Sequence, residues 1–292
     1  MQPLKRLTWT AELADTFWSD LANSDFLADI SFSKFAAPLL VDLAEQHLRK
    51  DDAILDFGAG AHLYLVQELL RRGFTVGYYE PNSSSRVSLA EVASSGCFLG
   101  SVSDLDHRRY DCVFLSEVIE HLSDESLSGV LSILERIVKA GGLLVVTTPD
   151  SEDLLSASRY CPVCRHLFHP WGHVRSFNPE QLRQLLANYG FECHEIHSVD
   201  FSAAREPIEE LKQLRAVIAD INRDVTTLAE ESELTSNKVM RTLRTHIERL
   251  THISGPHIPE DPKHRRIGFG GTLVAFARRQ AVPSEAPRSR QI

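Results

Sequence analysis

Short aliphatic runs alternate with segments of helical periodicity through the middle of this chain. Buried strands are predicted at 54–57, 74–79, 110–115, 141–149, 190–199 and 269–277. A helical pattern over 63–72 separates the first two strands, and similar alternation over 53–148 predicts a parallel sheet with right-handed crossovers. The expected fold class is therefore α/β, with a Rossmann-like seven-stranded sheet and helices on both of its faces.

Helical periodicity also predicts elements outside this sheet. Apolar positions within 1–50 predict an N-terminal helical cap, which either packs over a ligand or covers one sheet edge. Between the last two strands, apolar positions recur at alternating threes and fours and predict a helical hairpin inserted over 205–265. This hairpin is a lid, a dimerisation arm or a hairpin lying on its own domain. The sheet domain would comprise 51–204 and 266–281, and the tail over 282–292 is expected to be disordered.

The turn after the first predicted strand has the composition of a ligand-binding turn. Asp56 lies just before Gly58-Ala59-Gly60. Glycines allow close approach because they take positive φ and carry no Cβ, and the amides of the next helix point to the same place. About 20 residues on, Glu80 ends the second strand, where a nucleotide-binding βαβ unit places the acid that binds ribose hydroxyls. This is not the dinucleotide fingerprint, because Leu63 replaces its third glycine.

Composition narrows the class of protein. The 292 residues are 43% hydrophobic and 24% charged, which is ordinary for a globular protein. No apolar run approaches the length of a membrane span and no signal-like segment is apparent, so a cytoplasmic location is expected. The formal charge of −9 argues against a broad nucleic-acid surface. Five cysteines in such a chain favour thiols or a metal site over a disulfide framework.

Four motifs in order resemble class I S-adenosylmethionine (SAM)-dependent methyltransferases. They are the Asp56–Gly60 turn, Glu80, the strand and following segment over 110–122, and the Gly-Gly strand over 141–149. The resemblance covers roughly residues 35–200. It implies the class I methyltransferase sheet, SAM as the cofactor and an enzyme that transfers one-carbon groups.

The same resemblance implies roles for individual residues. Glu80 would bind both ribose hydroxyls, while Gly58 and Gly60 would let the backbone approach the amino-acid part of SAM. The implied cofactor set is completed by Asp56, Ser101, Val102, Asp104 and Ser116. In relatives an acid follows a residue like Gly100, but Ser101 stands there in this chain. Asp104 is therefore either an adenine ligand or a solvated turn residue, and the Val102 amide is the alternative.

Glu117, Glu120 and His121 form the first candidate chemical group. Their i,i+3 and i,i+4 spacing would place all three on one helix face beside the transferred methyl. They either bind a divalent cation, or His121 acts as a general base oriented by an acid. The motif resembles that of ubiquinone-pathway O-methyltransferases and of metal-dependent enzymes that methylate the 2′-hydroxyl of small RNAs. In the latter, a later histidine completes the metal site, and His169 or His173 stands in that region.

Cys161 and Cys164 form the second candidate group, within a Cys/His-rich loop over 151–177. Two thiolates two residues apart, followed by His169 and His173, have the composition of a structural zinc site. The alternatives are a redox pair and buried cysteines without ligands. Zinc bound there would leave neither histidine for a cation site with Glu117.

These observations predict a SAM-dependent methyltransferase that methylates a hydroxyl oxygen on a small molecule or glycan precursor. A metal-dependent RNA 2′-O-methyltransferase is one alternative, although the overall acidity counts against it. A non-catalytic SAM-fold interaction protein is the other. Nucleic acid is not an expected partner, no membrane span is expected, and the helical insertion is a candidate homodimer interface.

Overall fold

The computed structural model describes residues 4–22, 24, 31–81, 97–99, 101–201, 220–221 and 271–280. The chain divides into two compact units, Met1–Phe201 with Phe269–Ile292 and Ser202–Gly268. Except at residues 220–221, the predicted hairpin over 205–265 lies outside the described residues, as does the tail over 282–292. Within the described part of the chain, no helix is long and apolar enough to cross a membrane.

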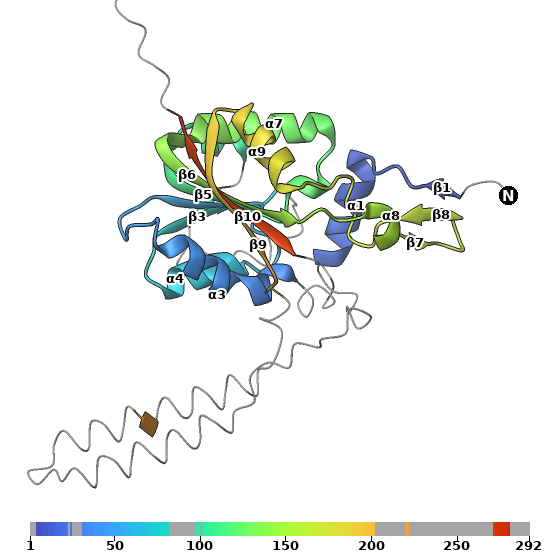
Figure 1. Ribbon diagram of the computed structural model, residues 1–292, viewed down its shortest axis with the longest axis horizontal. Coiled ribbons are helices and arrows are strands. Elements are labelled where there is room, and N and C mark those ends of the chain that lie inside the picture. Colours follow the sequence, from blue (N-terminus) through green and yellow to red (C-terminus); the bar gives the residue numbers. More distant parts are fainter. Residues whose placement is uncertain are drawn as a thin grey trace, which may run out of the picture. The chain divides into compact units, whose positions relative to one another are not determined.

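A seven-stranded sheet forms the centre of the first unit (Figure 1). In spatial order its strands are β4 (Cys97–Leu99), β3 (Val76–Tyr79), β2 (Ile54–Phe57), β5 (Tyr110–Ser116), β6 (Val138–Pro149), β10 (Thr272–Arg279) and β9 (Phe191–Val199). The strands from β4 to β6 are parallel, whereas β10 is antiparallel to both of its neighbours. The predicted α/β Rossmann-like fold is therefore confirmed. Strand order reverses between β2 and β5, which is where such sheets bind their ligands.

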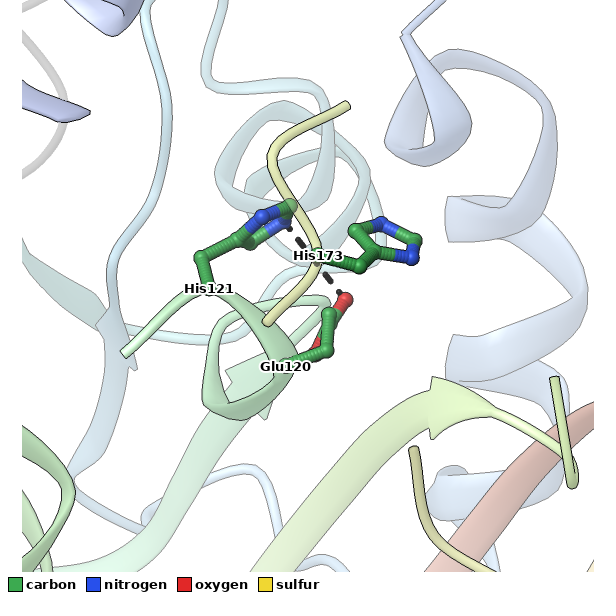
Figure 2. A group of neighbouring side chains, drawn as sticks. All are labelled: Glu120, His121 and His173. Carbon is green, nitrogen blue, oxygen red and sulfur yellow. Dashed lines mark ion pairs between the residues drawn. The ribbon is translucent and has the colours of Figure 1, made fainter. Parts of the chain in front are cut away.

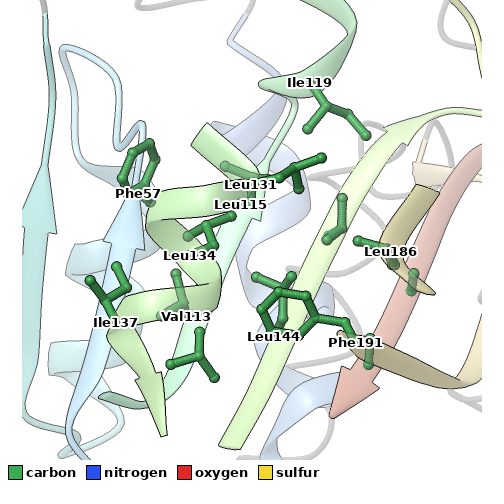
Figure 3. Packing of buried hydrophobic residues seen from close by; sticks show 14 of the residues in the cluster. Phe57, Val113, Leu115, Ile119, Leu131, Leu134, Ile137, Leu144, Leu186 and Phe191 are labelled. Carbon is green, nitrogen blue, oxygen red and sulfur yellow. The ribbon is translucent and has the colours of Figure 1, made fainter. Parts of the chain in front are cut away.

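Two helical layers cover the sheet, one on each face (Figure 1). The helices are α1 (Ala11–Ala22), α3 (Phe32–Glu45), α4 (Tyr64–Arg71), α6 (Val102–Asp106), α7 (Asp124–Ile137), α8 (Leu154–Ala157), α9 (Pro179–Ala187) and the 3-10 turn η1 (Ile119–His121). Helices α7 and α9 share a buried cluster with Val113, Leu115 and Leu144 of the sheet (Figure 3). Helices α3 and α4 share another with Phe114 and Val145. Neighbouring strand residues thus enter opposite clusters, as the alternation of strand side chains requires.

Helix boundaries follow from local capping. The Asn178 side chain accepts a hydrogen bond from the backbone amide of Gln181, and the Gln181 side chain accepts one from the backbone amide of Asn178. Pro179 occupies the first helical position of α9. Ser123 caps α7 by accepting from the amide of Ser126. An asparagine followed by a proline is a common start of a helix, because the side chain caps the first turn and proline lacks an amide that would need a partner there.

A second, three-stranded sheet was not predicted. Its order is β1 (Lys5–Arg6), β8 (His166–Phe168) and β7 (Arg159–Tyr160). β7 and β8 form an antiparallel hairpin inside the Cys/His-rich loop, and β1 adds to it in parallel from the N-terminus. Strands of two or three residues are too short to leave a detectable alternation in a sequence.

Candidate active site

A cavity of about 300 Å³ lies where β2, β3 and β5 end at their carboxyl termini. On the β2 and β3 side it is lined by Asp56, Gly58, Gly60 and Glu80. Residues that the sequence places up to 24 positions apart thus converge, as predicted for parallel strands whose ends share one sheet edge.

The glycine turn brings backbone close to this cavity. Gly58 and Gly60 have φ of 85° and 68°, a region that favours glycine. A Cβ on Gly58 would lie 2.7 Å from Cγ2 of Val118, whereas a Cβ on Gly60 would meet nothing within 4 Å. The amide of Gly60 donates to the Glu80 carboxylate at 2.8 Å. The second glycine therefore fixes the acid that ends β3.

Asp56 is buried beside this turn, with 2% of its surface exposed. Burial, and after it the negative charge of Glu80, raises the pKa of Asp56 to about 8. The carboxyl group is therefore mainly protonated at neutral pH. A cationic ligand in the cavity would stabilise its ionised form.

Ser101, Val102 and Asp104 have a structural role at the start of α6. The Asp104 carboxylate accepts from both the amide and the hydroxyl of Ser101, each at 2.9 Å. None of the three is among the described residues that line the cavity. The structure thus places Asp104 as a helix-capping acid.

Two of the predicted N-terminal helices reach the cavity. Trp18 of α1 and Phe32 of α3 line it, and Trp18 contacts His121 edge-on with ring centroids 4.8 Å apart. This arrangement favours the first of the two expected roles, that of a segment packing over the ligand. His62, which follows the glycine turn, also lines the cavity.

The backbone bends sharply where β5 ends. Ser116 bonds to the Thr147 hydroxyl at 2.9 Å, and Glu117 follows with φ of 53°. A glutamate in this left-handed region is uncommon, and such strain is concentrated at functional sites. The Glu117 amide donates to the carbonyl and hydroxyl oxygens of Thr147, which hold it in place.

The predicted helix through Glu117, Glu120 and His121 is wrong. Only the short turn η1 follows the bend, and α7 begins at Asp124. The three side chains nevertheless all line the cavity. Nε2 of His121 lies 3.6 Å from Oε1 of Glu120 (Figure 2). Convergence here comes from the bend and turn, not from helical spacing.

Burial disfavours the charged forms of these side chains. It raises the pKa of Glu117 to about 7, despite a hydrogen bond from Thr147, and raises that of Glu120 well above its ordinary value. Burial, followed by the nearby His173 and His169, lowers the pKa of His121 to about 3. Among the described residues, Oε1 of Glu117, Oε1 of Glu120 and Nδ1 of His121 are buried without a hydrogen-bond partner. Such atoms mark a place that a ligand would satisfy.

Glu152 was not predicted, and it organises the two histidines that were. Its carboxylate lies 3.1 Å from Nε2 of His169 and 2.5 Å from Nδ1 of His173. Burial alone would raise the pKa of Glu152, but these two hydrogen bonds lower it to about 2. Glu152 is therefore an anion held between two imidazoles, whose rings stack with centroids 4.1 Å apart.

The hydrogen bonds distinguish the two histidines. Nδ1 of His169 accepts from the amides of Trp171 and His173, so its Nε2 carries the proton that it donates to Glu152. No lone pair of His169 is left for a metal. His173 donates Nδ1–H to Glu152, so its Nε2 is the ring atom available as an acceptor. Glu120, His121 and His173 each offer a ligand atom within 4.8 Å of the others (Figure 2).

Comparison with known proteins places this fold and cavity in a family. The sequence profile of a methyltransferase domain matches residues 30–196. The chain belongs to this methyltransferase family. The prediction of a class I SAM-dependent methyltransferase is thereby confirmed. No curated protein matches the sequence significantly.

Solved structures are similar to this methyltransferase in fold. The Burkholderia thailandensis 1,6-didemethyltoxoflavin-N1-methyltransferase, solved with bound 1,6-didemethyltoxoflavin and S-adenosylhomocysteine, shares 16% identity with a TM-score of 0.54. The match covers 96% of this chain and 93% of that one. A SAM-dependent methyltransferase from Methanosarcina mazei shares 13% identity with a TM-score of 0.50, over 82% of this chain and 98% of that one.

The predicted zinc ligands of the methyltransferase do not come together. His169 and His173 are bound to Glu152, as described above. Cys161 and Cys164 lie at the tip of the β7–β8 hairpin, and no group of three possible ligands among the described residues includes either cysteine. The set of two cysteines and two histidines therefore does not fit a tetrahedral zinc ion in this structure.

Proposed function

We propose that this methyltransferase transfers the methyl group of SAM to a hydroxyl oxygen of a small molecule or glycan precursor. The observation that carries the proposal is one cavity that joins the glycine turn and Glu80 to Glu117, His121 and His173. The first part has the chemistry for the cofactor and the second has groups that can accept a proton.

On the cofactor side, Glu80 would bind the ribose hydroxyls and the Gly58–Gly60 backbone would approach the amino-acid part of SAM. The raised pKa of Asp56 supports this proposal, because SAM carries cationic sulfonium and ammonium groups. A cation in the cavity lowers the free energy of ionising a buried carboxyl group. Ser116 would add a polar contact at the end of β5.

On the acceptor side, we assign the proton acceptor to His173 in place of His121. His121 has a pKa of about 3 and so binds a proton weakly at neutral pH. Burial lowers the pKa of His173 as well, but the Glu152 anion bonded to its Nδ1 opposes that shift and would stabilise the imidazolium that forms when Nε2 takes a proton. The acceptor oxygen bonds to the methyl carbon as the sulfur–methyl bond breaks. The hydroxyl proton passes to Nε2 of His173, and the positive charge passes from sulfur to the imidazole. Glu117 and Glu120 would orient the acceptor.

A divalent cation is a second possibility for the same cavity. The three buried atoms without partners, together with the Glu120–His121–His173 group, fit such an ion. Glu152 on Nδ1 of His173 is the kind of carboxylate that orients a metal-binding histidine. A bound cation would act as a Lewis acid on the acceptor hydroxyl. RNA is disfavoured as its acceptor by the net charge of −9.

The test combines binding with transfer. Calorimetric titration should detect SAM binding, and labelled SAM should transfer methyl to members of a panel of hydroxyl compounds. His173→Ala should lower transfer by about 10²–10⁴-fold with SAM affinity nearly unchanged, whereas His121→Ala should lower it less. Transfer only to amines would overturn the choice of oxygen. Activity lost on chelation and restored by Mg²⁺ or Mn²⁺ would favour the metal-assisted form.

A further inference from the structure

The β7–β8 hairpin carries two cysteines in a turn outside the cavity. Cys161 follows β7, and the backbone amide of Cys164 donates to its Sγ at 3.5 Å. Arg165 completes the turn with φ of 59°, and its amide donates to the carbonyl of Cys161 at 2.8 Å. Amide hydrogen bonds to sulfur stabilise a thiolate. Two cysteines at this spacing in a tight turn can supply half of the ligands of a Cys₄ zinc site.

The other half is not among the described residues. The nearest histidine in sequence, His166, has Nδ1 2.6 Å from the carbonyl oxygen of Cys164 and so donates there. His169 and His173 are engaged by Glu152. A tetrahedral zinc ion needs four ligands, so the turn alone cannot complete the site.

The surroundings of the turn fit a copy of the same surface. Val163, between the cysteines, has 89% of its surface exposed, and Tyr160 has 47% exposed. Among the described strands, β7 lies at the edge of the small sheet and pairs with β8 alone. Arg165 in the turn is exposed and cationic, although the chain as a whole carries −9. A zinc ion with four thiolates carries a net charge of −2, and an arginine from each of two copies would offset it.

We propose that the Cys161–Cys164 turns of two copies of this methyltransferase bind one Zn²⁺ between them. Identical turns related by a twofold axis through the metal supply two pairs of equivalent thiolates, four ligands in all, in a tetrahedral arrangement. The exposed Val163 and Tyr160 side chains of both copies are buried around the ion. The partner is thus a second copy of the chain, joined at the hairpin and independent of the helical insertion.

Zinc titration of the reduced, chelator-treated full chain tests the proposal. About half a zinc ion should bind per chain, and light scattering should show that monomers become dimers as zinc is added. With Co²⁺ as the probe, the absorption spectrum should be that of a tetrathiolate site. Cys161→Ser and Cys164→Ser should each abolish zinc-dependent dimerisation. Cys193→Ser, which changes a half-buried thiol of β9, is the matched control and should leave it intact.

Other results would overturn the proposal. One zinc ion per monomer would mean that this chain closes its own site. A Cys161–Cys164 disulfide without zinc binding would mean a redox pair, and dimers that persist in both cysteine variants would mean a different interface. SAM titration of each variant verifies the fold, because the exposed hairpin tip is outside the cavity.

Discussion

Replacement of Gly58 by alanine tests the geometry of the glycine turn most directly. The amide of Gly58 donates to the carbonyl of Tyr79 at 2.8 Å, which fixes the turn against β3. An added Cβ would lie 2.7 Å from Cγ2 of Val118, closer than real Cβ atoms approach. Val118 would have to move, and it lines the cavity and packs against the core.

Gly60→Ala provides the matched reference for the size of this effect. Both glycines have positive φ, which costs an L-residue about 1–2 kcal/mol. Only at Gly58 does the new methyl meet a neighbour, and overpacking costs about 1–3 kcal/mol more. Gly58→Ala should therefore destabilise the protein by about 1–3 kcal/mol more than Gly60→Ala does. For a domain of this size that is a further Tm decrease of roughly 2–4 °C per kcal/mol.

A double-mutant cycle identifies the responsible contact. Val118→Ala removes Cγ2, so the cost of Gly58→Ala should fall by about 1–3 kcal/mol in that background. The cost of Gly60→Ala should stay the same, because no atom lies within 4 Å of its Cβ position. Chemical denaturation of the three single and two double variants measures both differences. Equal costs for the two glycine variants, with no coupling to Val118, would refute the close approach of the turn to Val118.

Three further outcomes are expected. Glu80→Ala should weaken SAM binding by about 100-fold or more, because hydrogen bonds to a carboxylate contribute about 1.5–3 kcal/mol each. An unchanged affinity in calorimetry would remove Glu80 from the cofactor site. The ligand-free protein should lose stability as pH rises from about 4 to 8, because the unfolded chain releases the Asp56 proton near pH 4 and the folded protein retains it to about pH 8. Asp56→Asn should reduce that slope by about 1.4 kcal/mol per pH unit in denaturation measured across the window. Glu152→Leu removes the acceptor for Nδ1–H of His173, so the nitrogen-15 NMR signals of that ring should change away from the Nδ1–H tautomer. An unchanged tautomer would contradict the assigned hydrogen bond.

The sheet could be predicted from the sequence because its signals are local. Strands β2, β3 and β5 are buried on both faces and so appear as largely apolar runs, and Asn178 and Pro179 mark the start of α9. The rule that parallel strands share their carboxyl edge then brings Asp56 and Glu80 together without knowledge of any side-chain contact.

The segment after β5 shows where local rules mislead. The spacing of Glu117, Glu120 and His121 fits one helix face. The three side chains do line one cavity, but they do not lie on a helix. The chain instead takes a left-handed bend at Glu117 because Thr147 of β6 binds its amide through two oxygens. That contact joins positions 30 residues apart, so no helical pattern contains it.

The two histidines of the loop after β6 also have partners that differ from those predicted. From the sequence, Cys161, Cys164, His169 and His173 are close enough to share one ion. In the structure, an antiparallel hairpin carries the cysteines to its tip, while Glu152 binds both histidines on the cavity side. A carboxylate is a stronger local partner for Nδ1–H of His173 than a distant thiolate, and it leaves Nε2 of that ring available. The hairpin therefore separates one apparent metal motif into a cysteine pair at the surface and a carboxylate–imidazole pair at the cavity.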